Sequence, residues 1–110
     1  MAEIITNSII WKTGETGKQY IVLYESDGIT RRNGIGKTYT LKFWLRGATN
    51  LYGSGSLTAV DASQGEYYYS VTSGNTVSAG DFEAEIAETT GSDILKTNTF
   101  EIQIVSGAPA

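Results

Sequence analysis

Apolar and polar residues alternate with a period of two over several stretches of the chain. The alternation is clearest in residues 37–46. One side of this stretch carries Tyr39, Leu41, Phe43 and Leu45, and the other side carries Thr38, Thr40, Lys42, Trp44 and Arg46. Such a period is typical of a half-buried β-strand. We therefore predict that the first set faces a core and the second set faces solvent.

The same test predicts six further strands. Three have clear alternation, and their inward sets are Tyr67/Tyr69/Val71, Phe82/Ala84/Ile86 and Phe100/Ile102/Ile104. The other three are Ile4–Trp11, Gln19–Glu25 and Ser56–Val60. The apolar run in 19–25 is continuous enough to predict burial on both faces of that strand.

Turn signals separate the predicted strands. Thirteen glycines and a single proline occur in the chain, and no window shows a sustained helical period. The predicted turns are Asp27-Gly28, Asn33-Gly34, Gly53-Ser54-Gly55, Gln64-Gly65, Ser73-Gly74-Asn75 and Gly91-Ser92. Short strands at this spacing predict an all-β fold, an immunoglobulin-like β-sandwich of about seven antiparallel strands.

The length of 110 residues fits one domain. We predict a single domain over residues 1–105, followed by a flexible C-terminal tail over 106–110. Residues 1–13 are a candidate docking or swapped strand, because a terminal strand can add to a neighbour's sheet.

Composition excludes many kinds of chemistry. The chain has no cysteine and no histidine, which removes thiolate and imidazole from catalysis and metal binding. We expect no enzymatic activity, no catalytic residue and no cofactor. Asp81, Glu83 and Glu85 form a row of carboxylates on one predicted strand face. Such a row could bind a hard cation, but it is more often a solvated strand face. We therefore expect no metal.

Charge and hydropathy narrow the partners. The net charge of −4 argues against binding to nucleic acid phosphates. The first ten residues contain Glu3 and no lysine or arginine, so we expect synthesis in the cytoplasm without a signal peptide. The longest apolar runs, such as residues 20–24, have five residues, which predicts no membrane insertion.

Arg31 and Arg32 are adjacent in the sequence. Such a pair is typical of a hydrated loop tip, and the alternative is that it binds a carboxylate or a phosphate.

Exposed aromatic residues are the strongest functional signal in the residues themselves. Trp44 is predicted to face outward, and an outward aromatic side chain is costly unless another surface covers it. Three interpretations remain open: a protein interface, a sugar-stacking platform, or cover from the chain's own segment Ile4–Trp11. The candidate interface residues are Trp44, Arg46, Tyr52, Tyr68 and Trp11.

The order of four segments carries a family resemblance. They are residues 38–47 (TYTLKFWLRG), 59–69 (AVDASQGEYYY), 79–86 (AGDFEAEI) and 99–104 (TFEIQI). This succession resembles the N-terminal immunoglobulin-like domain of phage baseplate upper proteins and related tail-fibre attachment domains, over about residues 19–105.

The resemblance implies a bacteriophage structural protein. It implies a small adaptor or decoration subunit of the tail or baseplate that docks on other virion structural proteins in multiple symmetric copies. The implied location is the virion, at the tail, the baseplate or the capsid surface. The alternative functions are a capsid decoration protein, or a carbohydrate-binding β-sandwich module that takes a host-surface glycan on a particle or cell surface.

Overall fold

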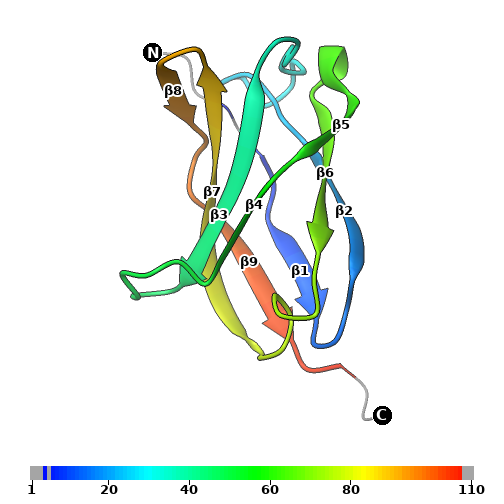
Figure 1. The fold of residues 1–110 in the computed structure, drawn as a ribbon, viewed down its shortest axis with the longest axis vertical. Helices are drawn as coiled ribbons and strands as arrows, with labels where there is room; N and C mark the ends of the chain where they lie inside the picture. The colour runs from blue at the N-terminus through cyan, green and yellow to red at the C-terminus, as the bar shows by residue number, and fades with distance from the viewer. Residues whose placement is uncertain (1–3, 5, 108–110) are drawn as a thin grey trace.

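The computed structural model describes residue 4 and residues 6–107, and these residues form an all-β fold (Figure 1). The all-β part of the predicted fold class is therefore confirmed. The strands are β1 (Ile9–Lys12), β2 (Gly17–Val22), β3 (Thr38–Leu45), β4 (Gly53–Ser56), β5 (Thr58–Asp61), β6 (Glu66–Val71), β7 (Gly80–Thr90), β8 (Asp93–Lys96) and β9 (Phe100–Val105), with one 3₁₀ turn, η1 (Ala62–Gln64).

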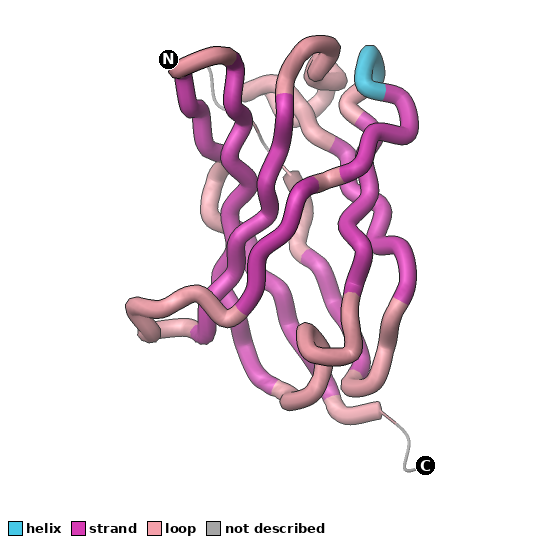
Figure 2. The backbone as a smooth tube through the Cα atoms, viewed as in Figure 1, coloured by secondary structure: helices cyan, strands magenta, loops and turns pink. Residues whose placement is uncertain are grey.

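Two sheets face each other across the core. The larger sheet has six strands in the order β1-β9-β7-β3-β4, with β8 also paired to β7, and the smaller has three in the order β2-β6-β5. Only Leu57 separates β4 from β5, so one extended segment leaves the larger sheet and joins the smaller one (Figures 1 and 2). The two sheets are thereby linked along this edge.

The prediction of a purely antiparallel fold is wrong for one pair. β1 runs parallel to β9, with Ile9 opposite Ile102 and Trp11 opposite Ile104. Alternation places a side chain on a face but carries no information on strand direction. The described residues also form nine strands rather than seven, because β8 lies where no strand is predicted and the predicted strand Ser56–Val60 is divided at Leu57 between β4 and β5. β8 and β9 pair with successive parts of β7, and β4 and β5 pair with different sheets.

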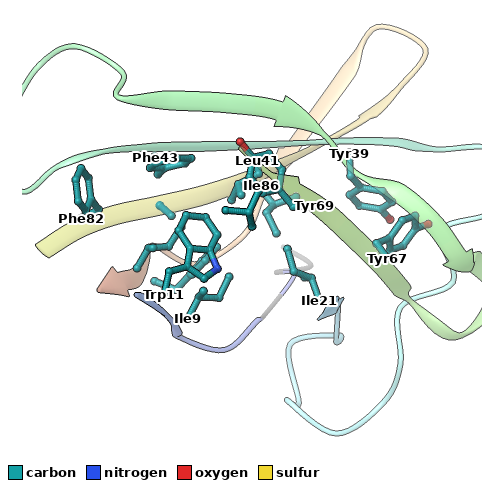
Figure 3. Close-up of a cluster of buried hydrophobic side chains, with 14 of the residues drawn as sticks. Ile9, Trp11, Ile21, Tyr39, Leu41, Phe43, Tyr67, Tyr69, Phe82 and Ile86 are labelled. Carbon is teal, nitrogen blue, oxygen red and sulfur yellow. The ribbon is translucent and has the colours of Figure 1, made fainter. Parts of the chain in front are cut away.

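The predicted inward residues form the core, with one exception. Tyr39, Leu41 and Phe43 are buried, as are the inward sets of β6, β7 and β9. Leu45 was predicted inward but is 48% exposed, because it is the last residue of β3. Figure 3 shows the aromatic part of the core, where the Tyr39 ring lies 4.8 Å from the Tyr67 ring of the opposite sheet.

The prediction of burial on both faces of residues 19–25 is wrong. Ile21 and Leu23 are buried, but Tyr20 between them is 61% exposed. The larger sheet covers the inner face of β2, and no described element covers its outer face. The run therefore has a solvated aromatic face, which a simple count of apolar residues does not reveal.

The segment Gly53-Ser54-Gly55 is a strand and not the predicted turn. Its glycines are needed for packing against aromatic rings. A Cβ atom on Gly53 would lie 2.4 Å from Cζ of Phe43, and one on Gly55 would lie 2.8 Å from Cε1 of Tyr69. The predicted turn at Gly91 is confirmed, with a left-handed φ of 61°.

Both ends of the described chain contact the body of the fold. Ile4 forms a parallel bridge with Thr97, and the N–H of Gly107 donates to Oγ1 of Thr13 over 2.9 Å. Residues 108–110 of the predicted tail lie outside the described residues, as do 1–3 and 5 of the predicted docking strand. In the part of the chain that is described, no helix has the length and apolar character to cross a membrane.

Candidate docking surfaces

Trp44 lies on the outer face of the larger sheet. Alternation along β3 directs it away from the buried Phe43, and it stands opposite Glu83 of β7, half-buried. The first strand does not cover it, because β7 and β9 separate β3 from β1 in the sheet. The alternative of cover from segment Ile4–Trp11 is therefore wrong.

Arg46 follows the end of β3 and reaches across the same face. Its Nη2 atom lies 2.6 Å from Oε2 of Glu101, and the two side chains are 56% and 42% exposed. An ion pair this exposed contributes at most about 1 kcal/mol, because water and salt screen it. The guanidinium of Arg46 is thus held only weakly and remains accessible to a carboxylate on another molecule.

Tyr52 lies just before β4 and packs on the end of the core. Its ring centroid is 4.6 Å from that of Phe82, and the residue is 37% exposed. The neighbouring Leu51 is 54% exposed. Leu45 and Leu51 were not among the predicted site residues, although the Leu51-Tyr52 pair between polar residues and glycine was a usable signal.

The structure thus brings three predicted candidates to one end of the molecule. We define the β3–β4 end as Trp44, Leu45, Arg46, Leu51 and Tyr52. The loop between β3 and β4 projects beyond the body of the sandwich in the view of Figure 1. Aromatic side chains and arginine are residue types enriched where proteins bind each other, and Leu45 and Leu51 add exposed apolar area beside them.

Tyr68 lies apart from this end, on the outer face of the smaller sheet. Its ring meets that of Tyr20 edge-on, with centroids 6.2 Å apart, and Nζ of Lys18 stands 4.8 Å from the centre of the Tyr68 ring. Register explains the pair, because Tyr20 and Tyr68 are direct partners in β2 and β6. The smaller sheet therefore carries a separate aromatic patch.

Trp11, the fifth candidate, lies in the core. It is 2% exposed, its ring stacks on Tyr69 at 6.1 Å, and it meets Phe43 edge-on at 5.7 Å (Figure 3). Its Nε1 donates to Oε1 of Gln19 over 2.9 Å. The expectation that Trp11 serves at an interface is corrected, because in this fold its ring has no free face.

Arg32 forms an internal ion cluster in place of a hydrated loop tip. Its Nε and Nη2 atoms donate to Oε2 and Oε1 of Glu88 over 3.0 and 2.8 Å. Nη1 donates to Glu25, and the hydroxyl of Tyr39 donates to Glu88 over 2.6 Å. Arg32 therefore binds carboxylates, which was the alternative to a hydrated loop tip, but the carboxylates are those of Glu25 and Glu88 in the same chain.

The cluster shifts the pKa values of its members. Burial alone would raise the pKa of Glu88, but hydrogen bonds from Arg32 and Tyr39, with the nearby positive charges, hold it below its usual value. Burial and the adjacent Glu88 carboxylate raise the pKa of the Tyr39 hydroxyl. The cluster therefore stays ionised at neutral pH as a structural element.

The row Asp81, Glu83 and Glu85 lies on the outer face of β7. Among residue 4 and residues 6–107, no group of three or more acidic side chains is arranged to hold a metal ion. Glu85 instead pairs with Nζ of Lys96 at 3.3 Å. The row has the position of a solvated strand face.

Solved structures contain the same fold. The chain is similar to the N-terminal domain of ORF48 of phage TP901-1, with 17% sequence identity and a TM-score of 0.66. The match covers 93% of this chain and 95% of that one. A likeness at this identity establishes a shared fold. No protein-family model matches the chain, and no curated protein matches it.

Proposed function

We propose that this chain is a structural protein of a phage virion, a small adaptor or decoration subunit that acts by docking on other virion proteins. The observation that carries the proposal is the fold shared with a phage protein domain over nearly the full length of both chains. The order of the four sequence segments, which resembles phage attachment domains, supports it independently. The tail or baseplate is the proposed location.

The strand order supports an immunoglobulin-like arrangement. In that arrangement strands C, F and G share one sheet, and strands B, E and D share the other. Here β3, β7 and β9 correspond to C, F and G, while β2, β6 and β5 correspond to B, E and D. The parallel partner β1 then adds a strand beside G. Such sandwiches present loops at both ends, where binding residues concentrate.

Docking through the β3–β4 end is the second part of the proposal. Leu51 and Leu45 expose apolar surface there, Tyr52 offers a ring held by Phe82, and Arg46 has only a solvent-screened partner. A rigid aromatic group with exposed aliphatic neighbours supplies contact area at a low entropic cost. The proposed partner surface is apolar with at least one carboxylate to receive Arg46.

Immunogold electron microscopy of purified particles tests the location. Antibodies raised against the full chain are applied to phage particles from a culture that expresses it. Label at the tail or baseplate supports the proposal, and label over the head supports the capsid decoration alternative. If the chain sediments only with soluble lysate proteins and never with particles, the proposed virion role is wrong.

Incorporation of tagged variants tests the docking surface. Leu51→Asp and Trp44→Ala should each lower the amount of tagged chain per particle by about tenfold, the ratio expected for the loss of one buried anchor. Ile29→Asp is the matched control, since Ile29 is 81% exposed on a different loop. Equal incorporation of all three variants would remove the β3–β4 end from the proposal while leaving the virion role intact.

A further inference from the structure

The side of the sandwich opposite the β4–β5 crossing contains a cleft of about 150 Å³, between the segment that precedes β1 and strand β2. We propose that this cleft binds a neutral pyranose, as one sugar residue of a glycan. The site is separate from the β3–β4 end and does not depend on the proposed virion role. It is built from Thr6, Asn7, Ser8, Gln19, Tyr20 and Tyr24.

The cleft exists because two sheet edges meet there without pairing. β1 is the edge strand of the larger sheet and β2 is the edge strand of the smaller one. Side chains span the gap in place of a strand ladder. The hydroxyl of Thr6 donates to the carbonyl oxygen of Val22 over 2.9 Å, and the indole of Trp11 donates to Gln19.

The volume suits one six-membered ring. A cavity of about 150 Å³ in another protein holds benzene, which has six heavy atoms against twelve in a hexopyranose, so an open cleft of this size receives one side of such a ring. Drug-sized ligands need about 300 Å³ or more. The cleft therefore has room for one side of a terminal sugar or of one unit in a longer glycan, with the remainder in solvent.

The lining selects an uncharged ligand rich in hydroxyl groups. Among the described residues that line the cleft, none carries a charge. The amide of Asn7 and the hydroxyl of Ser8 are exposed and make no hydrogen bond with any other described side chain or backbone group. An amide that both donates and accepts matches neighbouring sugar hydroxyls, which do the same. An anionic ligand would find no charged partner in this lining.

Two tyrosines supply the apolar contact that sugar binding requires. Tyr20 is 61% exposed, and its ring is braced edge-on by Tyr68. Tyr24 borders the same cleft, with the guanidinium of Arg31 at 5.8 Å from the centre of its ring. An aromatic face packs well on the C–H face of a pyranose, and a tyrosine adds a polar hydroxyl at its rim.

An added peptide strand fits this edge less well. In an antiparallel pair, only every second residue of a strand forms backbone hydrogen bonds with the partner strand. The N–H of Leu23 donates to the carbonyl oxygen of Gly65, so in this register Ile21 and Gln19 bond to β6. The backbone groups of Tyr20 and Val22 therefore point to the free edge of the sheet. Both carbonyl oxygens are already occupied, that of Val22 by Thr6 and that of Tyr20 by the amide of Gln19. A strand would have to displace both donors, whereas a sugar needs neither carbonyl.

Chemical-shift titration of the full-length, ¹⁵N-labelled chain tests the site. The probes are glucose, galactose, mannose, N-acetylglucosamine and rhamnose, each up to about 50 mM, because one sugar unit in an open cleft binds in the millimolar range. Glucuronic acid is the charged probe. The peptide Ac-Thr-Val-Thr-Val-Thr-Val-NH₂ tests strand addition.

Saturable shifts of the amides of Asn7, Ser8, Tyr20 and Val22 with at least one neutral sugar support the proposal. The proposal is overturned by the absence of a saturable shift with any neutral sugar, by equal binding of glucuronic acid, or by saturation of the same amides by the peptide alone. A glycan bound with the shifts confined to the β3–β4 end would also overturn it.

Matched variants assign the binding to the cleft. Tyr20→Ala and Asn7→Ala should each weaken the sugar affinity by about tenfold, which corresponds to the loss of one good contact. Tyr20→Phe retains the ring and should stay within about threefold of the natural chain. Trp44→Ala changes an aromatic residue on the other sheet and should leave the affinity unchanged. Equal weakening in Trp44→Ala would show that the effect does not arise in the cleft.

Discussion

Arg32, in the loop between β2 and β3, forms a two-point ion pair with Glu88 of β7, with donor to acceptor distances of 3.0 and 2.8 Å. The side chain of Glu88 is only 4% exposed, and that of Arg32 is 13% exposed. The neighbouring pair of Arg31 and Glu66 has a comparable distance of 3.0 Å, but both of its side chains are 40% exposed. Two adjacent arginines in one loop thus both pair with a glutamate, one pair largely buried and the other open to solvent.

Removal of the Arg32 guanidinium should destabilise the protein severely. Arg32→Met leaves the buried Glu88 carboxylate without its main partner, and the loss of one member of a buried pair costs about 3–5 kcal/mol in the free energy of unfolding. Arg31→Met, the matched control, should cost about 1 kcal/mol or less. Urea unfolding at neutral pH followed by tryptophan fluorescence measures both. Equal losses would contradict the assigned difference in burial.

Stability should fall on the acid side below about pH 4.5. The pKa of Glu88 is held below its ordinary value of 4.5, despite burial, by Arg32 and Tyr39. The unfolded chain therefore takes up protons first, and the stability contributed by Glu88 is present above pH 4.5 and lost as pH falls through its folded-state pKa. Urea midpoints across this range measure the decline. In Glu88→Gln the acid decline should be shallower, and an unchanged slope would contradict the assignment.

Stability should also fall on the alkaline side above about pH 10. Burial raises the pKa values of Tyr39, Tyr67 and Tyr69 above the ordinary value of 10.0. The unfolded chain then loses its phenolic protons first, so these groups stabilise the fold fully below pH 10 and progressively less above it. Urea midpoints between about pH 9 and 12 measure the effect. Tyr69→Phe should flatten part of the decline.

The inward faces of the strands followed from the sequence because each carries its own alternation. Tyr39, Leu41 and Phe43 needed no knowledge of the rest of the chain. The position of Trp11, in contrast, depends on a distant part of the chain. Its place in the core follows from parallel pairing with β9, a contact between residues more than ninety positions apart, which no local pattern encodes.

Alanine at the glycines of β4 should destabilise the fold. Gly55→Ala places a Cβ atom 2.8 Å from the Tyr69 ring, and overpacking of this kind costs about 1–3 kcal/mol. Ser54→Ala, between the two glycines and exposed on the opposite face, should change stability by about 0.5 kcal/mol or less. Thermal unfolding of the two variants provides the comparison. A neutral Gly55→Ala would mean that Tyr69 can rotate away freely.

Loss of the first strand should unfold the domain. Trp11→Ala removes a ring packed between both sheets, for a cost of about 3–5 kcal/mol. Ile10→Ala, on the same strand but 66% exposed, should cost far less. Deletion of residues 1–13 should give a chain without cooperative unfolding. A folded deletion variant that has lost only its assembly would instead favour the swapped-strand interpretation.

The candidate surfaces were predictable to different degrees. Trp44 and Tyr68 are predictable because, two positions away on either side, the outward face of each strand carries polar residues, Lys42 and Arg46 for Trp44, and Glu66 and Ser70 for Tyr68. Leu45 was misplaced because alternation continues past the point where the facing sheet ends. The cleft beside β2 had no sequence signal, since it arises where two strand edges from different sheets meet without pairing. Such a feature depends on topology, and the residues around it are ordinary surface types.

The parallel pairing of β1 with β9 has a mechanical consequence. The described chain enters near one end of the 42 Å long axis and leaves near the other. Tension applied through residues 4 and 107 would draw β1 toward its start and β9 toward its end, so the two strands would be loaded in opposite directions along their length. The evenly spaced hydrogen bonds of a parallel pair would share that shear and have to break together. The domain is therefore expected to keep its length when it is pulled from both ends.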